Sequence, residues 1–461
     1  MSASQSKPQS FERDLEQLEA LAVAPVVSAN GLARNLGHMY QLVAGAHFHD
    51  HDIAAVSKAA PALMYRLFDL RIALRSRIAE FEKRGFMGPE VVQGLRDVFR
   101  ILRYVSDMLG EIATGNARVG EGEYVLRAFT GRDRNTLVNY AYYNGKELPF
   151  RTGDVVLVRG RAHNSAAIAR IGQADSQFSH TGIIYIEGEG KHWLVESLIE
   201  DGATINTLSH ALDHGIVRAV LYRHKDAELA ARAAQRVHDL IARSRTFGHR
   251  RFHYDFSMRM DDGRNFFCSK LVRYAFGQAS EGRYRPPAYP TEIAMKNRDF
   301  IERIGIRAEK TYAPADIDIE SAFDLVAEWQ DYRETSNIRL QDFTMDKLFE
   351  WMERDRMRFE ETVLVRLISR FGRMSSYLSE GAKQMLSGLF PRVPRNMPRK
   401  TVAVVAMLHQ TAEPIYRELQ ETEAVCVAET GRPLHGEEIF GLLEAIRARD
   451  KHRVGYLVAQ A

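Results

Sequence analysis

One cysteine in the sequence has surroundings that suit nucleophilic chemistry. Cys268 opens the run 268–274, whose apolar spacing predicts a helix that begins at the cysteine itself. A free thiol is mostly protonated at neutral pH, and a helix N-terminus or a neighbouring imidazolium favours the thiolate. His180 stands directly before a β-branched run, so we expect it at the start of a strand. The pattern predicts thiol catalysis with Cys268 as nucleophile and His180 as base.

A carboxylate on a second strand could orient that base. Residues 192–197 are typical of a short strand, on which alternation places Glu196 and His192 on the same face. A catalytic histidine needs a partner for its second ring nitrogen, because that partner fixes the tautomer and the ring orientation. We expect Glu196 to be this partner of His180, and His192 is the alternative.

The elements that must position these residues form a small α+β unit. Glycine-bounded, β-branched runs predict strands at 154–159, 182–186 and 193–195. An alanine-rich run predicts a helix at about 227–244, and a further helix is expected from Cys268 onward. The strands are close together in sequence, which favours a small antiparallel sheet.

Both flanks of this unit have the pattern of helices. Apolar residues at helical spacing run from residue 11 to about 115 and again from about residue 317 onward. We therefore expect three regions: an N-terminal helical region at 1–145, an α+β domain at 146–315 and a C-terminal helical region at 316–461. Neither flank shows a strand pattern, so their helices could pack together as one bundle.

Five short motifs along the central region together resemble a known family. They are Gly153-Asp154, Ser179–Ile183, Val195-Glu196, Tyr254-Asp255 and Cys268–Val272. In this order they resemble the YiiX-type cysteine hydrolases, the circularly permuted papain-like branch of the NlpC superfamily. Lecithin retinol acyltransferase is a more distant member of the same superfamily. The resemblance covers residues 146–300, and the permutation explains why the histidine precedes the cysteine.

The resemblance implies a fold and a set of site residues. The fold would be a circularly permuted papain-like, NlpC-type domain. Its catalytic residues would be Cys268, His180 and Glu196, with the backbone N–H of Cys268 as an oxyanion donor. Weaker candidates for lining the site are Tyr254, Asp255, Ser179 and His192. Lys270 departs from the family pattern, which is usually acidic there; it would change the charge at the site mouth or lie on a solvated helix face.

The function that follows is a cysteine hydrolase that cleaves an amide or ester bond through an acyl-enzyme. No metal or organic cofactor is needed for this chemistry, and the substrate would be a peptide or an acyl-bearing molecule. An acyltransferase or lipase-like enzyme would use the same acyl-enzyme on membrane lipid or lipidated substrates. A third alternative is a catalytically inactive binding or scaffold protein whose helical regions engage a partner.

Composition limits the class of protein further. The 461 residues are 45% hydrophobic and 27% charged, which is typical of a soluble globular chain. Two cysteines allow no disulfide framework, and a formal net charge of +3 does not call for a nucleic-acid partner. The N-terminus lacks the pattern of a secretory signal, and no apolar run reaches the ~18 residues of a membrane span. We expect a cytoplasmic protein. Export by a pathway that needs no cleaved signal is left open, and so is the oligomeric state.

Three other segments could carry function. His47, His49 and His51 alternate with two aspartates, which suits either a metal or, as we favour, the acidic entry to a helix near residue 53. The basic segment 363–400 has an apolar face in its first half and could contact an anionic membrane surface; we favour a helix that packs on the core. Cys426 lies in an apolar run and is expected to be buried and inert.

Overall fold

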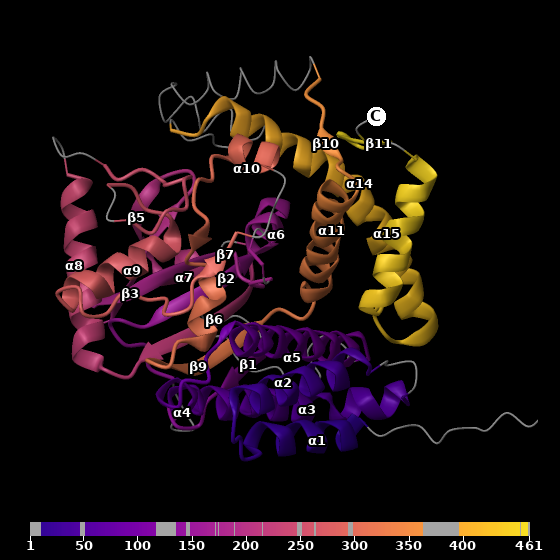
Figure 1. The fold of residues 1–461 in the computed structure, drawn as a ribbon, viewed down its shortest axis with the longest axis horizontal. Helices are drawn as coiled ribbons and strands as arrows, with labels where there is room; N and C mark the ends of the chain where they lie inside the picture. Colours follow the sequence, from indigo (N-terminus) through magenta and orange to yellow (C-terminus); the bar gives the residue numbers. More distant parts are fainter. Residues whose placement is uncertain are drawn as a thin grey trace, which may run out of the picture.

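A seven-stranded antiparallel sheet is the centre of the molecule (Figure 1). The computed structural model describes residues 11–46, 51–116, 135–143, 148–170, 172–173, 175–188, 190–213, 215–246, 251–261, 264–293, 298–362, 396–451 and 453–459. The strand order is β1-β9-β6-β2-β3-β4-β5. The strands span Asn135–Val138 (β1), Val155–Gly160 (β2), His180–Glu187 (β3), Lys191–Leu198 (β4), Gly202–Thr207 (β5), Ile216–His224 (β6) and Phe323–Gln330 (β9). The three predicted strands correspond to β2, β3 and β4.

The two faces of the sheet belong to different hydrophobic cores. One face packs on α8 (Ala227–Ser244) and α9 (Cys268–Ala279), in a cluster that includes Val195 of β4. The other face carries Leu194 and packs on α7 (Leu208–Asp213). This division confirms the alternation expected along β4. The predicted helix at 227–244 is α8, and Asp226 caps it by accepting a hydrogen bond from the backbone of Leu229.

In the described part of the chain, five helices precede the sheet and extend its first core. Figure 1 shows them together beneath the sheet, and their apolar stripes belong to the same cluster as its α8/α9 face. They span Phe11–Val23 (α1), Ala29–Ala44 (α2), Ile53–Ser76 (α3), Ile78–Lys83 (α4) and Pro89–Asn116 (α5). Asp52 caps α3 by accepting from the backbone N–H groups of residues 54 and 55, as the acidic helix entry predicted. His47 and His49 lie outside the described residues.

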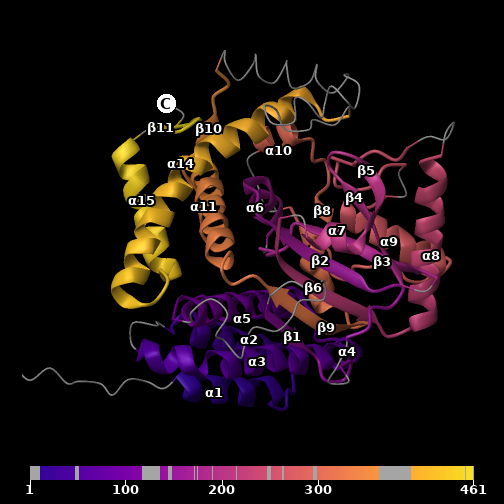
Figure 2. The same cartoon turned by 180° about the vertical axis from the view of Figure 1, so that it is seen from behind.

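The helices after the sheet have a core of their own. They span Thr335–Arg354 (α11), Arg399–Thr430 (α14) and Gly436–Asp450 (α15), and Figure 2 shows them side by side. A separate cluster of apolar residues fills the space between them. The helical flanks therefore have two cores, and they pack on each other where α11 contacts α5.

Short elements complete the described chain. A small sheet beside the C-terminal helices contains Arg358–Phe359 (β10), Arg453–Val454 (β11) and Leu457–Val458 (β12). The central region adds His163–Arg170 (α6), Thr291–Glu292 (β7), Arg298–Ile304 (α10), Lys310–Thr311 (β8) and the 3-10 helix Pro314–Ile319 (η2).

The prediction that both flanks lack strands was wrong. The N-terminal flank supplies β1 and the C-terminal flank supplies β9, which pairs with both β1 and β6. The sequence of β9 does not indicate a buried strand, because Glu328 and Gln330 interrupt the apolar alternation. Both are completely buried, and Arg71 of α3 forms an ion pair with Glu328. A charge that is neutralised by a distant arginine leaves no local hydrophobic signal.

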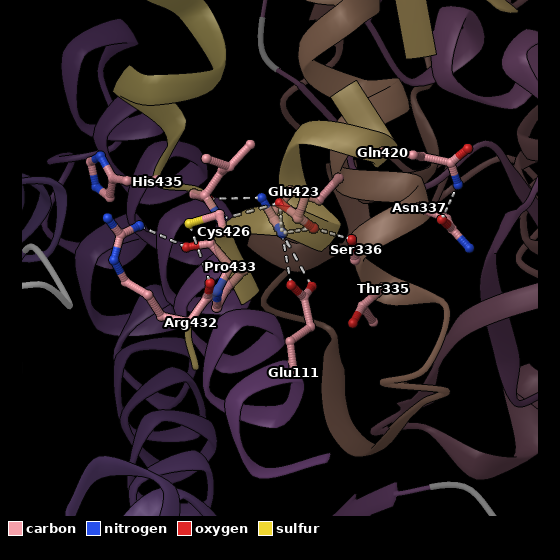
Figure 3. Close-up of polar contacts among 12 residues, drawn as sticks. Glu111, Thr335, Ser336, Asn337, Gln420, Glu423, Cys426, Arg432, Pro433 and His435 are labelled. Atoms are coloured by element: carbon pink, nitrogen blue, oxygen red, sulfur yellow. Dashed lines mark hydrogen bonds and ion pairs between the residues drawn. The ribbon is translucent and has the colours of Figure 1, made fainter. Parts of the chain in front are cut away.

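A buried arginine joins the N-terminal and C-terminal helices. Arg339 of α11 is 1% exposed and lies between two carboxylates, 2.7 Å from Glu111 of α5 and 2.8 Å from Glu423 of α14. Glu111 and Glu423 point toward one another from different helices (Figure 3). Burial is the main cause that raises the pKa of Glu111 to about 7, and the charge of Glu423 adds to it against the opposing effect of Arg339.

In the part of the chain that the structure describes, no helix combines the length and the apolar character needed to cross a membrane. The basic segment 363–400, for which membrane contact was the alternative to a helix packed on the core, lies outside the described residues from 363 to 395.

Candidate active site

Three neighbouring strands bring polar side chains to one end of the sheet. His180 is the first residue of β3, and Gly182, two residues later, is paired with Glu196 of β4. His180 and Glu196 consequently share a face as diagonal neighbours. The Nε2 atom of His180 lies 2.6 Å from Oε2 of Glu196, which is 3% exposed. The predicted pair therefore meets, and the carboxylate can fix the orientation of the ring.

Asn206 extends this series of side-chain contacts to a third strand. It lies on β5, directly across from Leu194, and its side-chain amide donates to Oε1 of Glu196 at 2.6 Å. Both oxygens of Glu196 are thus engaged, one by His180 and the other by Asn206. Asn206 was not predicted as a site residue, because no strand was predicted at 202–207. Alternation along that strand would have placed Asn206 on the face of Glu196.

Cys268 is the first residue of α9, as predicted. Its N-cap, Phe267, provides no side-chain hydrogen bond, so the first turn of the helix leaves backbone N–H groups to act at the site. The segment before the cysteine is held in place: Ser197 donates to the carbonyl of Phe266 at 2.6 Å, and Tyr254 forms a β-bridge with the same residue. Cys268 is 5% exposed.

The cysteine and the histidine interact closely enough to shift each other's pKa values. Burial opposes ionisation of Cys268, but the hydrogen bond from His180 and its positive charge lower the pKa of the thiol below its ordinary 9.0. Burial likewise opposes protonation of His180, yet Cys268 and Glu196 together raise the pKa of its imidazole to about 10. The arrangement favours a thiolate and an imidazolium at neutral pH.

An aromatic cluster surrounds the start of α9. Tyr254, Phe267 and Tyr312 are its buried members, and Phe256 and Met258 pack on them while partly exposed. Burial raises the pKa of Tyr254 and of Tyr312 well above 10, and the negative charge of Cys268 contributes to both shifts. Both hydroxyl groups therefore stay protonated. The structure thus brings the predicted Tyr254 close to the cysteine and adds Tyr312, which no local motif indicated.

Lys270 matches neither role expected for it. It is 2% exposed, and its ammonium group lies 2.7 Å from Asp255 and 2.8 Å from Asp261. It therefore lies neither on a solvated helix face nor unpaired at the site mouth. Asp255 also accepts from Ser257, so its carboxylate holds the loop after Tyr254 against α9. This ion pair explains why a lysine is tolerated at a buried position.

Two other predicted residues take different positions. Ser179 is buried, and its backbone N–H donates to Val158 of β2 at 3.0 Å. His192 is paired with Ile186, at the far end of β3 from His180, and its ring packs edge-on against Phe150. His192 is therefore not brought to the site as the alternative third member.

Asp154, from the first of the five motifs, has a structural role. Its carboxylate accepts two hydrogen bonds from Arg223 of β6, at 2.8 and 2.7 Å. Gly153 has φ +97°, and a Cβ atom there would lie 2.5 Å from the backbone of Ala230 in α8. Glycine is therefore required where β2 begins beneath α8.

The second cysteine differs from its prediction. Cys426 of α14 is partly exposed, and its sulfur lies 3.6 Å from the hydroxyl of Thr430 and from the carbonyl of Arg432. One side of α14 is exposed at this point, because Val425 is 56% exposed. The expectation of full burial was wrong, since an apolar run on an amphipathic helix does not have to face the core.

Comparison with known families gives the central region a class. Residues 149–315 match the family model of the permuted papain-like amidase enzymes, YaeF/YiiX, C92 family. The match covers a little over a third of the chain, and it confirms the resemblance expected for this region. It supports a cysteine hydrolase or amidase at the level of the family. No curated protein matches the chain.

The roles of Asn206 and Glu196 in orienting His180 can be tested by substitution. We expect Glu196→Gln to lower kcat by less than the roughly 10²- to 10⁴-fold loss typical of removing a general base. Asn206→Ala should cause a smaller loss, because Glu196 then keeps its contact with His180. If both residues act by stabilising the imidazolium, each substitution should also lower the pKa that governs the alkaline limb of kcat/KM. A loss of kcat with an unchanged pH profile would contradict this positioning role.

Proposed function

We propose that the chain is a cysteine hydrolase that cleaves an amide or ester bond through an acyl-enzyme on Cys268. The observation that carries the proposal is the continuous set of contacts from Cys268 to His180 and on to Glu196. These are a nucleophile, a base that interacts with it and a carboxylate that orients the base. The family match at 149–315 supports amidase chemistry for the same residues.

In the proposed reaction, the Cys268 thiolate attacks the substrate carbonyl carbon and forms a tetrahedral oxyanion. The backbone N–H of Cys268, at the positive end of α9, is placed to donate to that oxyanion. The imidazolium of His180 then protonates the leaving amine or alcohol as the carbon–heteroatom bond breaks. In the second half, His180 removes a proton from water, which attacks the thioester, and the acid product leaves with the thiolate restored.

The aromatic cluster beside Cys268 supports an apolar group on the substrate. Its partly exposed members include Phe256, Met258 and Met260, and flexible methionines adapt to apolar groups of irregular shape. An acyl chain or a large apolar side chain would suit this surface. The same observation favours acyl transfer as a second candidate, because an apolar surface beside the thioester would disfavour water relative to an alcohol or amine acceptor.

Intact-mass analysis tests the proposal directly. The full chain is incubated with lipid and peptide extracts, acid-quenched and weighed, and we expect a mass increase that peptide mapping assigns to Cys268. Cys268→Ala should remove the increase, whereas Cys426→Ala should preserve it. Transfer and hydrolysis are separated by a labelled acyl donor, whose label ends on an acceptor in one case and as free acid in the other. Equal labelling of both cysteines by an electrophilic probe would instead support an inactive scaffold.

A further inference from the structure

A group of three metal-binding side chains lies away from Cys268, between the central region and the C-terminal helices. His163 is the first residue of α6, and His409 and Glu413 are four residues apart on α14. Side chains at this spacing lie on the same face of a helix, which here packs against α6. One ligand atom from each of the three residues lies within 4.8 Å of the other two.

His163 is prepared to act as a ligand. Its side chain is 4% exposed, and its Nε2 atom lies 2.9 Å from Oε2 of Glu413. The other ring nitrogen, Nδ1, is buried and has no hydrogen-bond partner among the described residues.

Glu413 provides the negative charge. Its second oxygen accepts from Arg417 at 2.8 Å, which fixes the carboxylate from behind. His409 is exposed, and its ring lies 5.2 Å from that of His163, measured between ring centres. The group is thus anchored on its buried side and open to solvent at His409.

We propose that His163, His409 and Glu413 bind a divalent transition-metal ion of the zinc class. Two imidazoles and one carboxylate form a common zinc ligand set, which leaves a fourth position for water. Tetrahedral zinc with ligand distances near 2.0 Å needs ligand atoms about 3.3 Å apart. The exposed ring of His409 can make the small inward movement that this requires. The sequence offered one sign of the site, the spacing of His409 and Glu413, but their partner is nearly 250 residues away.

A metal at this position would join two parts of the molecule. α6 belongs to the segment that matches the amidase family, whereas α14 belongs to the C-terminal helices. Replacing one hydrogen bond by three metal–ligand bonds would stabilise their contact, because only the folded chain brings the three ligands together. The site lies outside the catalytic residues and its role is to hold these two parts together.

Zinc binding to the full chain tests the proposal. The Cys268→Ala protein is used throughout, because the Cys268 thiolate and His180 could themselves bind zinc. Titration calorimetry with ZnCl₂ should give one site per chain, and added zinc should raise the melting temperature. Co²⁺ should give the visible absorption of a site with nitrogen and oxygen ligands.

Matched variants distinguish this site from other histidines. His409→Ala and Glu413→Gln should each weaken zinc binding at least about 10-fold and remove most of the rise in melting temperature. His49→Ala, in the histidine-containing segment before α3, should bind zinc like its Cys268→Ala parent. Undiminished binding in both His409→Ala and Glu413→Gln, loss of binding in His49→Ala, or the absence of saturable binding in the parent would each overturn the proposal.

Discussion

His180→Ala should slow the alkylation of Cys268 by iodoacetamide at pH 7 at least about tenfold, because each unit of thiol pKa changes the thiolate fraction tenfold in this range. Burial by itself raises the pKa of Cys268, and the hydrogen bond and charge of His180 bring it below 9.0. Removing the imidazole leaves the burial and deletes the opposing effects. The thiol pKa in the variant should therefore lie above its ordinary value, with little thiolate at neutral pH.

The pH dependence of alkylation separates this cause from a change in access. In the unmodified protein the rate should fall as the pH drops through the lowered pKa of Cys268. In His180→Ala the same fall should occur at higher pH, while both proteins reach similar rates at strongly alkaline pH. Cys426, which lies on α14, serves as an internal reference for general reactivity. A uniformly slower rate at every pH would mean that His180 controls access and not ionisation.

Turnover should respond more strongly than alkylation. Cys268→Ala should abolish both the acyl-enzyme and activity while keeping the melting temperature, since the thiol is small and α9 has its other apolar contacts. His180→Ala should reduce kcat by roughly 10²- to 10⁴-fold, the range for general acid–base catalysis, in addition to the loss of thiolate. Measurable turnover by Cys268→Ala would exclude the proposed nucleophile.

The residues at the site differ in how far the sequence could predict them. His180, Glu196 and Cys268 each stand at a strand or helix position that a local pattern defines, so their meeting follows from strand pairing. Asn206 and Tyr312 gain their positions from pairings and contacts that no local pattern records. The family resemblance added the order of the motifs, which the residues alone do not supply.

Buried charges likewise limit how much of the fold could be predicted from the sequence. Helices with clear amphipathic patterns, such as α8, have the predicted bounds. β9 was missed because Glu328 is polar in the sequence but is buried beside Arg71 of a distant helix. Lys270 was misjudged for the same reason, since Asp255 and Asp261 neutralise it only after the chain has folded. In each case a partner distant in sequence or in a neighbouring loop decides whether a charge is buried.

Arg339→Met should destabilise the protein by about 3–5 kcal/mol at pH 8, the cost typical of removing one partner of a buried ion pair. Arg339 is 1% exposed and contacts both Glu111 and Glu423. Methionine fills similar space without the charge, so the two carboxylates would remain buried and facing each other. Chemical denaturation followed by circular dichroism measures the free energy of unfolding.

The destabilisation should depend on pH in a definite direction. The pKa of Glu111 is raised from 4.5 to about 7, so its contribution to stability is fully present below 4.5 and is lost as the pH rises through 7. Without Arg339, which lowers the pKa of Glu111, that pKa should rise further. Arg339→Met should therefore be much closer in stability to the unmodified protein at pH 5 than at pH 8, because a protonated Glu111 no longer repels Glu423.

A surface arginine gives the matched control. Arg449 also pairs with two carboxylates, Glu418 and Asp450, but on the exposed side of α15. Solvent replaces these contacts, so Arg449→Met should leave the unfolding midpoint nearly unchanged at both pH values. Comparable losses in both variants would mean that arginine contributes through its aliphatic packing. A loss in Arg339→Met that does not shrink toward pH 5 would contradict the assignment of the effect to Glu111, because ionised Glu111 is buried facing Glu423 and depends on the arginine to neutralise it.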